Sequence, residues 1–287
     1  MAPLPAVVFS HGNGFPAGTY RVMLDSLRAR GFEVDAVEKF GHDPAYPVTD
    51  NWPHLVAQLA DYARAVVERS GGPVFLVGHS LGGLLSLMCA ARHPELARGI
   101  VLVDSPAIGG WRANTLGLVK RTPLMKSVSP SMVSRRRRNT WAHRDEVFEH
   151  FRGKKVFARW DEQVLRDYIE HGTSVRAAAS DADVDTEAAR TAQAQERTLS
   201  FDRNVETAIY DTLPHNLGAL LRAHPLKCPA AFIGGRHSRE MRQVGMAFTQ
   251  RLTRGRIMML DGSHLFPMER PLASAAAIEA SLRNMLD

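Results

Sequence analysis

Short apolar segments alternate with longer segments of helical periodicity along most of the chain. The apolar segments span residues 6–9, 32–37, 74–77, 100–103, 230–234 and 256–260. The helical patterns span residues 20–30, 54–70, 81–93, 244–252 and 271–286. Such alternation is typical of parallel strands joined by crossover helices. It predicts an α/β fold with a mostly parallel sheet of about six strands flanked by helices.

The alternation is interrupted after Pro106. From residue 107 to residue 213 the sequence has no clear buried strand, carries most of the charge clusters and includes a polar, alanine-rich stretch. This composition predicts a mostly helical insertion in the α/β domain. We therefore expect residues 1–106 and 214–287 to form one core, and residues 107–213 to form a helical cap.

The sequence FLVGHSLGG places a serine between an apolar strand and a helix of small residues. Gly78 and Gly82 flank Ser80 in a G-x-S-x-G pattern. A serine on a sharp strand-to-helix turn crowds its neighbours, and glycines on both sides relieve the contact. Its hydroxyl would project from the carboxyl edge of the sheet, near the N-terminal amides of the next helix. The context favours a nucleophile over a glycine turn that only packs the helix against the strand.

Together with two further motifs, this turn resembles the α/β-hydrolase fold superfamily, in particular its esterase- and lipase-like members with a helical cap. The motifs are HGNG at 11–14, GHSLG at 78–82 and GSH at 262–264, in the family's chain order. The chain begins almost directly at the strand before HGNG. We therefore expect the two N-terminal strands common in the family to be missing, and a sheet of about six strands rather than eight.

The resemblance also implies how a reaction centre would be built. It places two oxyanion-binding backbone amides at Leu81, directly after the serine, and at Asn13 in the HGNG loop. It places the general base at His264, in the loop after the last strand, where an imidazole can lie beside Ser80.

Two other histidines lie beside the motifs, among 12 in the chain. His11 opens the HGNG loop, and we expect it to pack and shape that loop rather than transfer protons. His79 precedes Ser80, so its side chain is expected to point away from the serine hydroxyl. Both are therefore interpreted as structural.

The carboxylate that would orient His264 has two candidates, because Ser238 occupies the family's usual position for the acid. Asp104 ends the fourth strand, a position that haloalkane dehalogenases and some other members use. Glu240 lies two residues beyond Ser238 and has a longer side chain. Neighbouring strands about 4.8 Å apart place Asp104 within reach, although an aspartate there also serves to bond loop amides. We favour Asp104, because a rigid strand end holds an imidazole tautomer best.

Composition and charge exclude several other classes of protein. The 287 residues are 45% hydrophobic and carry a formal net charge of +6. The four adjacent arginines at 135–138 would point all round a helix, and no nucleic-acid motif accompanies them. Cys89 and Cys228 have no zinc or disulfide spacing, so a reducing compartment fits. The N-terminus has no basic n-region, and no apolar run approaches the ~18 residues of a membrane span, so we expect a soluble cytoplasmic protein without a secretory signal.

These observations predict a serine hydrolase of small-molecule carboxylic esters that needs no cofactor or metal and has no nucleic-acid or membrane partner. A thioesterase, a lactonase and a carbon–carbon bond hydrolase are alternatives within the class, and a noncatalytic ligand receptor with the same fold is the alternative outside it. The oligomeric state stays open, with a homodimer as one alternative. The cap's large side chains would line an acyl pocket or form the cap's own core: Trp111, Trp141, Trp160, Met125 and Met132.

Overall fold

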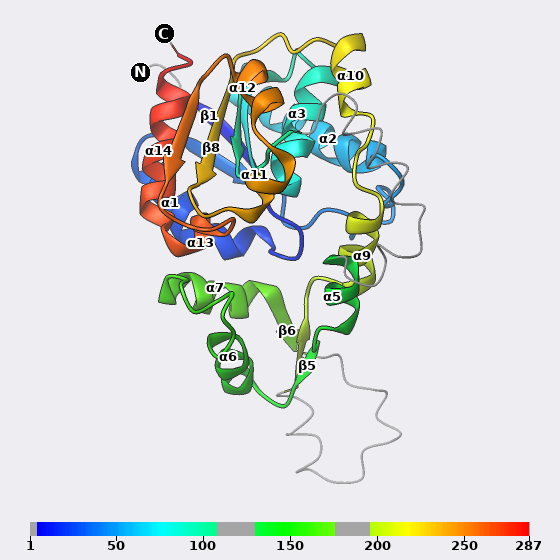
Figure 1. The fold of residues 1–287 in the computed structure, drawn as a ribbon, viewed down its shortest axis with the longest axis vertical. Helices are drawn as coiled ribbons and strands as arrows, with labels where there is room; N and C mark the ends of the chain where they lie inside the picture. Colours follow the sequence, from blue (N-terminus) through cyan, green and yellow to red (C-terminus); the bar gives the residue numbers. More distant parts are fainter. Residues whose placement is uncertain (1–4, 108–129, 176–195, 287) are drawn as a thin grey trace.

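The computed structural model describes residues 5–107, 130–175 and 196–286 (Figure 1). The described strands are β1 (Ala6–Ser10), β2 (Glu33–Ala36), β3 (Val74–His79), β4 (Ala97–Val103), β5 (Thr140–Trp141), β6 (Thr173–Val175), β7 (Arg197–Leu199), β8 (Ala230–Gly235) and β9 (Ile257–Leu260). The described helices are η1 (Ala17–Tyr20), α1 (Arg21–Ala29), α2 (Pro53–Ser70), α3 (Leu81–Arg92), α5 (Pro130–Arg136), α6 (Arg144–Arg152), α7 (Glu162–Gly172), α9 (Arg203–Asp211), α10 (Leu217–Ala223), α11 (Arg239–Val244), α12 (Ala247–Thr253), α13 (Phe266–Glu269) and α14 (Pro271–Arg283).

Six strands form one parallel sheet in the order β2-β1-β3-β4-β8-β9. In the middle of the sheet, Val8 lies opposite Leu76, and Leu76 lies opposite Ile100. Because all six strands run the same way, the segments that follow them meet at one carboxyl edge. The predicted α/β fold and its six strands are confirmed.

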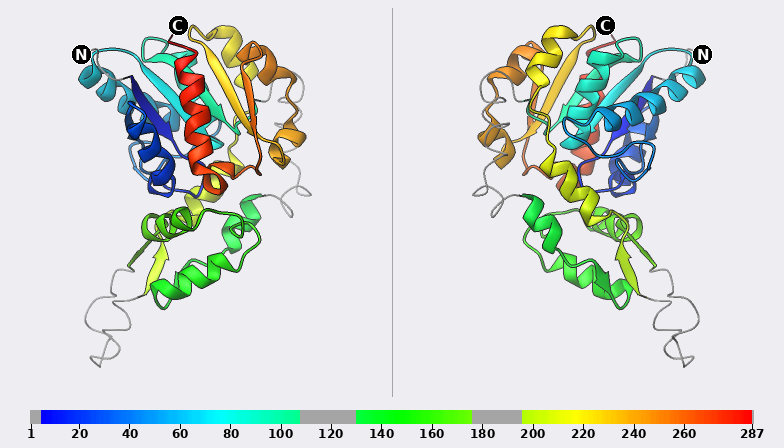
Figure 2. Two further views of the ribbon diagram at one scale, coloured as in Figure 1. Left: turned by 90° about the vertical axis from the view of Figure 1, so that its left-hand side faces the viewer. Right: turned by 90° about the vertical axis from the view of Figure 1, so that its right-hand side faces the viewer.

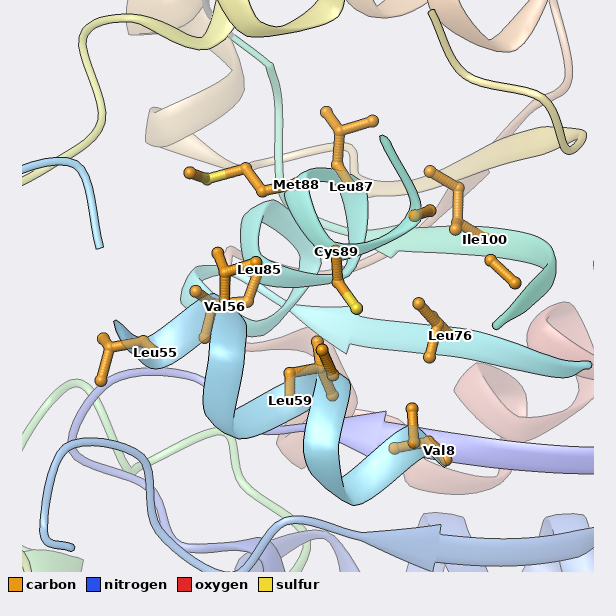
Figure 3. Packing of buried hydrophobic residues seen from close by; sticks show 14 of the residues in the cluster. Val8, Leu55, Val56, Leu59, Leu76, Leu85, Leu87, Met88, Cys89 and Ile100 are labelled. Carbon is orange, nitrogen blue, oxygen red and sulfur yellow. The ribbon is translucent and has the colours of Figure 1, made fainter. Parts of the chain in front are cut away.

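The sheet is buried on both faces because alternate residues of its strands enter different cores. On one face Val8, Leu76 and Ile100 pack beneath α2 and α3, where Leu59 and Leu85 contribute (Figure 3). The opposite face carries a second apolar cluster with residues from α1 and α14. Figure 2 shows α14 on one side of the sheet and α3 with α10 on the other. This two-sided burial accounts for the uninterrupted apolar segments in the sequence.

The helix ends follow local chemistry. Pro53 begins α2 at a position where its missing N–H has no consequence. Gly71 ends α2 with φ 78°, and Gly31 follows α1 with φ 88°. These left-handed conformations favour glycine, as the predicted helix ends required. Among the described helices, none has the length and apolar character needed to cross a membrane.

The chain between β4 and β8 contains sheet as well as helices. Besides α5, α6, α7, α9 and α10, it forms a small antiparallel sheet in the order β5-β7-β6 that the sequence pattern did not predict. Much of this segment lies together beyond the carboxyl edge of the large sheet (Figures 1 and 2). The division into a core and a cap at residues 107 and 213 stays a prediction.

Aromatic side chains fill the inner face of this segment. Trp141 and Trp160 are buried there, Phe157 stacks on Tyr168, and Phe151 contacts both of these rings at an angle. The same apolar cluster extends into the large sheet. The predicted pocket residues Trp111 and Met125 lie outside the described residues, and Met132 is half-buried on α5.

Candidate active site

Ser80 lies at the junction of β3 and α3 in a strained conformation. Its φ of 54° and ψ of −114° fall outside the regions that residues with a side chain favour. Its amide donates to the carbonyl oxygen of Val103 at 3.0 Å, which holds the turn against β4. A Cβ atom on Gly78 would lie 2.2 Å from the backbone of Gly82, and one on Gly82 would lie 2.0 Å from the carbonyl oxygen of Ser10. Both glycines are therefore required for the close approach at this turn.

His264 reaches Ser80 from the loop between β9 and α13. Its Nε2 lies 3.0 Å from Ser80 Oγ, and its Nδ1 lies 3.1 Å from Asp104 Oδ1. A carboxylate only accepts, so the neutral ring donates its Nδ1 proton to Asp104 and accepts the Ser80 hydroxyl proton at Nε2. The three side chains thus form one continuous chain of hydrogen bonds at the carboxyl edge of the sheet.

Asp104 is fully buried where β4 ends, with φ 41°. Its Oδ2 accepts from the amide of Gly235 at 2.7 Å, and its Oδ1 accepts from the hydroxyl of Ser238 at 2.7 Å. Ser238, which stands where the family usually has its acid, therefore bonds the carboxylate that lies beside His264. Glu240 is half-exposed, and its Oε2 lies 3.8 Å from His264 Nδ1, beyond hydrogen-bond distance. The geometry brings Asp104, not Glu240, into contact with the imidazole.

The charge state of His264 is controlled by these neighbours. Burial lowers the pKa of His264, whereas the hydrogen bond and charge of Asp104 and the charge of Glu240 raise it. The net effect is a pKa above the ordinary value of 6.5. His264 is therefore protonated more readily than a free imidazole, which is the state a base must reach after it accepts a proton.

The HGNG loop is held by its own side chains and by Tyr20. Buried His11 donates from Nδ1 to the carbonyl oxygen of Gly12 and accepts at Nε2 from the amide of Phe40 at 3.0 Å. Burial is the main cause that lowers the pKa of His11 to about 4, so the ring is neutral. The amide of Gly12 donates to the hydroxyl of Tyr20 at 3.0 Å. Among the residues that the structure describes, His11 thus bonds only within its loop and to Phe40, in keeping with the packing role expected from the sequence.

Two backbone amides, those of Asn13 and of Leu81 directly after Ser80, have no hydrogen-bond acceptor in the described part of the protein. Leu81 is the first residue of α3, where helical N–H groups have no internal partner. The side chain of Asn13 is anchored through its Nδ2 to the carbonyl oxygen of Glu206 at 2.9 Å. Both positions named from the sequence thus carry amides without a protein acceptor among the described residues, and their role as oxyanion donors stays a prediction.

His79 points away from the serine and contacts two other segments. Its Nδ1 lies 2.7 Å from the Tyr20 hydroxyl, and its Nε2 lies 2.9 Å from the carbonyl oxygen of His264. The ring is fully buried, and this burial is the largest cause that lowers the pKa of His79 to about 3. It therefore stays neutral wherever the fold is stable.

A cavity of about 870 Å³ opens between the sheet edge and the elements that follow β4. Ser80 and His264 lie in its wall, and aromatic rings from both sides line it: Phe15, Phe151, Phe157 and Tyr210. One residue of the arginine run, Arg137, also lines the cavity, where it donates to Glu206 at 2.7 Å. The cavity can therefore hold a small molecule beside Ser80 in largely apolar surroundings.

Three contacts at this site were not predicted from the sequence. Tyr20 was assigned only to a helical pattern, Ser238 only marked a missing acid, and Glu206 had no motif. Each meets its partner across a large separation in sequence, so no local pattern signals it. Only for Ser238 was there a signal, because a hydroxyl in the usual place of the acid suggests a bond to the carboxylate that replaces it.

Comparison with known proteins identifies the family. A model of the alpha/beta hydrolase family matches residues 7–277. The chain belongs to the α/β hydrolase family. Among solved structures, this α/β hydrolase is similar to E-2-(acetamidomethylene)succinate hydrolase, with a TM-score of 0.72 and 20% identity over 97% of this chain and 91% of that one. At this identity the similarity shows the fold alone.

Curated relatives of this α/β hydrolase include lipases and esterases. A monoglyceride lipase homolog of Monkeypox virus is 24% identical over 180 residues, which are 57% of this chain and 63% of that protein. An esterase of Mycobacterium tuberculosis is 36% identical over 101 residues, which are 35% of this chain and 33% of that protein. The chain thus matches less than two thirds of the length of either relative. These relatives support a general hydrolase activity.

Proposed function

We propose that this α/β hydrolase is a serine hydrolase that cleaves small-molecule carboxylic esters through an acyl-enzyme intermediate. The observation that carries the proposal is the continuous hydrogen-bond chain from Ser80 Oγ through the His264 ring to Asp104, with distances of 3.0 and 3.1 Å. Nucleophile, base and orienting acid stand in the arrangement that acyl transfer requires. The lipase and esterase relatives support an ester as the bond that is cleaved.

In the first half of the reaction, Ser80 Oγ attacks the ester carbonyl carbon while His264 Nε2 takes the hydroxyl proton. Asp104 holds the ring in the required tautomer and stabilises the imidazolium. The negative charge that develops on the carbonyl oxygen is bound by the amides of Leu81 and Asn13. When the tetrahedral intermediate collapses, His264 returns its proton to the leaving alcohol oxygen, and the acyl group stays on Ser80.

In the second half, a water molecule replaces the alcohol. His264 Nε2 takes a proton from the water as its oxygen attacks the acyl carbon, and the same two amides bind the second oxyanion. Collapse breaks the bond to Ser80 Oγ, which regains the proton from His264 and releases the carboxylic acid. In this proposal residues 107–213 act as the cap, and Phe151 and Phe157 hold the apolar part of the ester beside Ser80.

The test is hydrolysis of 4-nitrophenyl esters of increasing acyl length, beside matched thioesters and lactones. The expected result is ester cleavage by the wild-type protein and loss of at least about 1,000-fold in kcat in Ser80→Ala, with unchanged thermal unfolding. A higher kcat/KM for thioesters or lactones than for esters would mean that the protein is a thioesterase or a lactonase instead. Tight binding of these molecules without turnover would instead indicate the noncatalytic receptor.

A further inference from the structure

Cationic side chains outnumber carboxylates in the wall of the cavity that contains Ser80. The cations in this wall are Arg137, Lys154, Lys155, Arg159 and Arg239. The carboxylates are Glu206, Glu240 and Glu269. The excess matters only if the carboxylates are already engaged, because a free carboxylate would neutralise a neighbouring cation.

Two of the carboxylates already have hydrogen-bond and ion-pair partners within the protein. Glu206 accepts from Arg137 at 2.7 Å in a buried pair, and the same guanidinium donates to the Tyr168 hydroxyl at 2.6 Å. Glu269 accepts from the amide and hydroxyl of Ser263 at 3.1 and 2.6 Å. Glu269 also lies 3.8 Å from the Arg159 guanidinium, so the charges of these two carboxylates are taken up by Arg137 and Arg159.

The third carboxylate, that of Glu240, lies beside His264 and Ser238. It lies 3.8 Å from His264 Nδ1 and 3.4 Å from the Ser238 hydroxyl. Within the described residues, none of Lys154, Lys155 and Arg239 has a carboxylate within ion-pair distance. Three cations at the cavity therefore lack an anionic partner.

Lys154 is the best placed of these cations, because it is half-buried in the short loop after α6 while the other two are exposed. Its Nζ lies 5.2 Å from the centre of the Phe151 ring, a contact that keeps the ammonium at the cavity wall. Burial and the charges of Arg137 and Arg138 lower the pKa of Lys154. An anion bound beside it would offset both effects.

We propose that the substrate is an ester that carries a carboxylate on its acyl part, and that this carboxylate pairs with Lys154 while the ester carbonyl lies at Ser80. Lys155 and Arg239 at the rim attract the same charge from solution. This inference rests on the proposed ester hydrolysis and adds the substrate class to it. The aromatic wall of Phe151 and Phe157 accommodates the methylene chain between the two ends of the substrate.

The test compares two esters of equal length, mono-4-nitrophenyl adipate and 4-nitrophenyl 6-oxoheptanoate, in which a methyl ketone replaces the distal carboxylate. The wild-type protein is expected to have a kcat/KM roughly tenfold higher for the adipate, the factor that one charge-assisted hydrogen bond supplies. Lys154→Met should remove this preference through a higher KM for the adipate alone. The control Arg152→Met removes the same charge from the end of α6, outside the cavity, and should keep the preference.

Equal kcat/KM for the two esters, or the same preference in Lys154→Met as in the wild-type protein, would overturn the substrate class and leave ester hydrolysis intact. If neither ester is cleaved and Ser80 does not react with a fluorophosphonate, the proposed function itself fails. The two failures are therefore distinguishable.

A second inference comes from the buried hydrogen bonds of His79, which are independent of the cavity charges. The carbonyl oxygen of His264 can only accept, so His79 carries its proton on Nε2. Nδ1 of the neutral ring then accepts from the Tyr20 hydroxyl, and the oxygen of that hydroxyl accepts from the amide of Gly12. One chain of hydrogen bonds thus links the HGNG loop to Tyr20 at the end of η1, Tyr20 to His79 at the end of β3, and His79 to the loop that carries His264.

The Gly12 amide donates to Tyr20 in this chain, so it is not available to an oxyanion. The chain of hydrogen bonds also fixes the backbone of His264 relative to the strand that carries Ser80. We infer that His79, supported by Tyr20, is a positioning residue that holds the His264 imidazole between Ser80 and Asp104. His79 acts through the His264 carbonyl and touches no reacting atom.

The test measures kcat, KM and the pH profile of kcat/KM in His79→Leu, His79→Gln and Tyr20→Phe. In His79→Leu we expect kcat to fall at least about tenfold with KM nearly constant, and the acidic limb to move to lower pH as the bond from His264 to Asp104 loosens. His79→Gln keeps a donor near the Nε2 position and should recover part of kcat. An unchanged kcat and an unchanged acidic limb in His79→Leu would refute the inference. If that variant does not fold, Tyr20→Phe, which removes a single oxygen atom, gives the same test.

Discussion

Acidification should destabilise this fold strongly, because two fully buried imidazoles must stay neutral in it. Burial is the leading cause that lowers the pKa of His11 to about 4 and that of His79 to about 3. In the unfolded chain both rings titrate near the ordinary value of 6.5. Their contribution to stability is therefore present above about pH 6.5 and is lost as the pH falls, because the unfolded chain then binds protons that the folded state does not.

The magnitude follows from the separation of these pKa values. At pH 5, which is about 1.5 units below the unfolded value, each ring is protonated in the unfolded chain and still largely neutral in the fold. Each unit corresponds to about 1.4 kcal/mol, so each histidine removes about 2 kcal/mol of unfolding free energy between pH 7.5 and pH 5. His264 acts in the opposite direction, because its pKa is raised and its contribution is present at low pH and lost as the pH rises.

Urea unfolding at pH 7.5 and pH 5, followed by tryptophan fluorescence, measures this difference. In His79→Gln, which cannot titrate, the drop between the two pH values should be about 2 kcal/mol smaller than in the wild-type protein. His54→Gln is the control, since His54 is exposed on α2 and its replacement should leave the drop unchanged. The reasoning is refuted if His79→Gln loses as much stability on acidification as the wild-type protein.

Three further predictions concern the site. Asp104→Asn should lower kcat by about 1,000-fold or more while Glu240→Gln lowers it less than about tenfold, and steady-state kinetics with an unchanged thermal unfolding curve would establish the contrast. The kcat/KM of the wild-type protein should fall as the pH drops through a value above 6.5, since the pKa of His264 is raised, and this limb should move to lower pH in Glu240→Gln. Gly82→Ala should lose about 3 kcal/mol or fail to fold, as measured by thermal unfolding, because the new Cβ would lie 2.0 Å from the Ser10 carbonyl oxygen.

The sheet could be predicted because strands that are buried on both faces consist of uninterrupted apolar residues. β3 and β4 have such segments, and Gly78 and Gly82 mark the turn where a side chain would collide with backbone. The antiparallel sheet beyond β4 was not predicted. Its strands are only two or three residues long, which is too short to display the alternation by which a strand is detected.

The choice between Asp104 and Glu240 shows where sequence reasoning reaches its limit. Both lie after strands at the carboxyl edge, and their separation along the chain says nothing about distance to His264. What separates them in the structure is a set of contacts between β4 and β8, where the Gly235 amide and the Ser238 hydroxyl hold the Asp104 carboxylate. No pattern along a single strand encodes such a contact.

Reaction with a fluorophosphonate followed by peptide mass spectrometry tests most directly that Ser80 is an activated nucleophile. The expected result is one phosphonylated site, on the peptide that contains Ser80, with labelling that is slowed strongly in His264→Ala and abolished in Ser80→Ala. Absence of an adduct in the folded wild-type protein, or an adduct on a different serine, would contradict the proposed reaction.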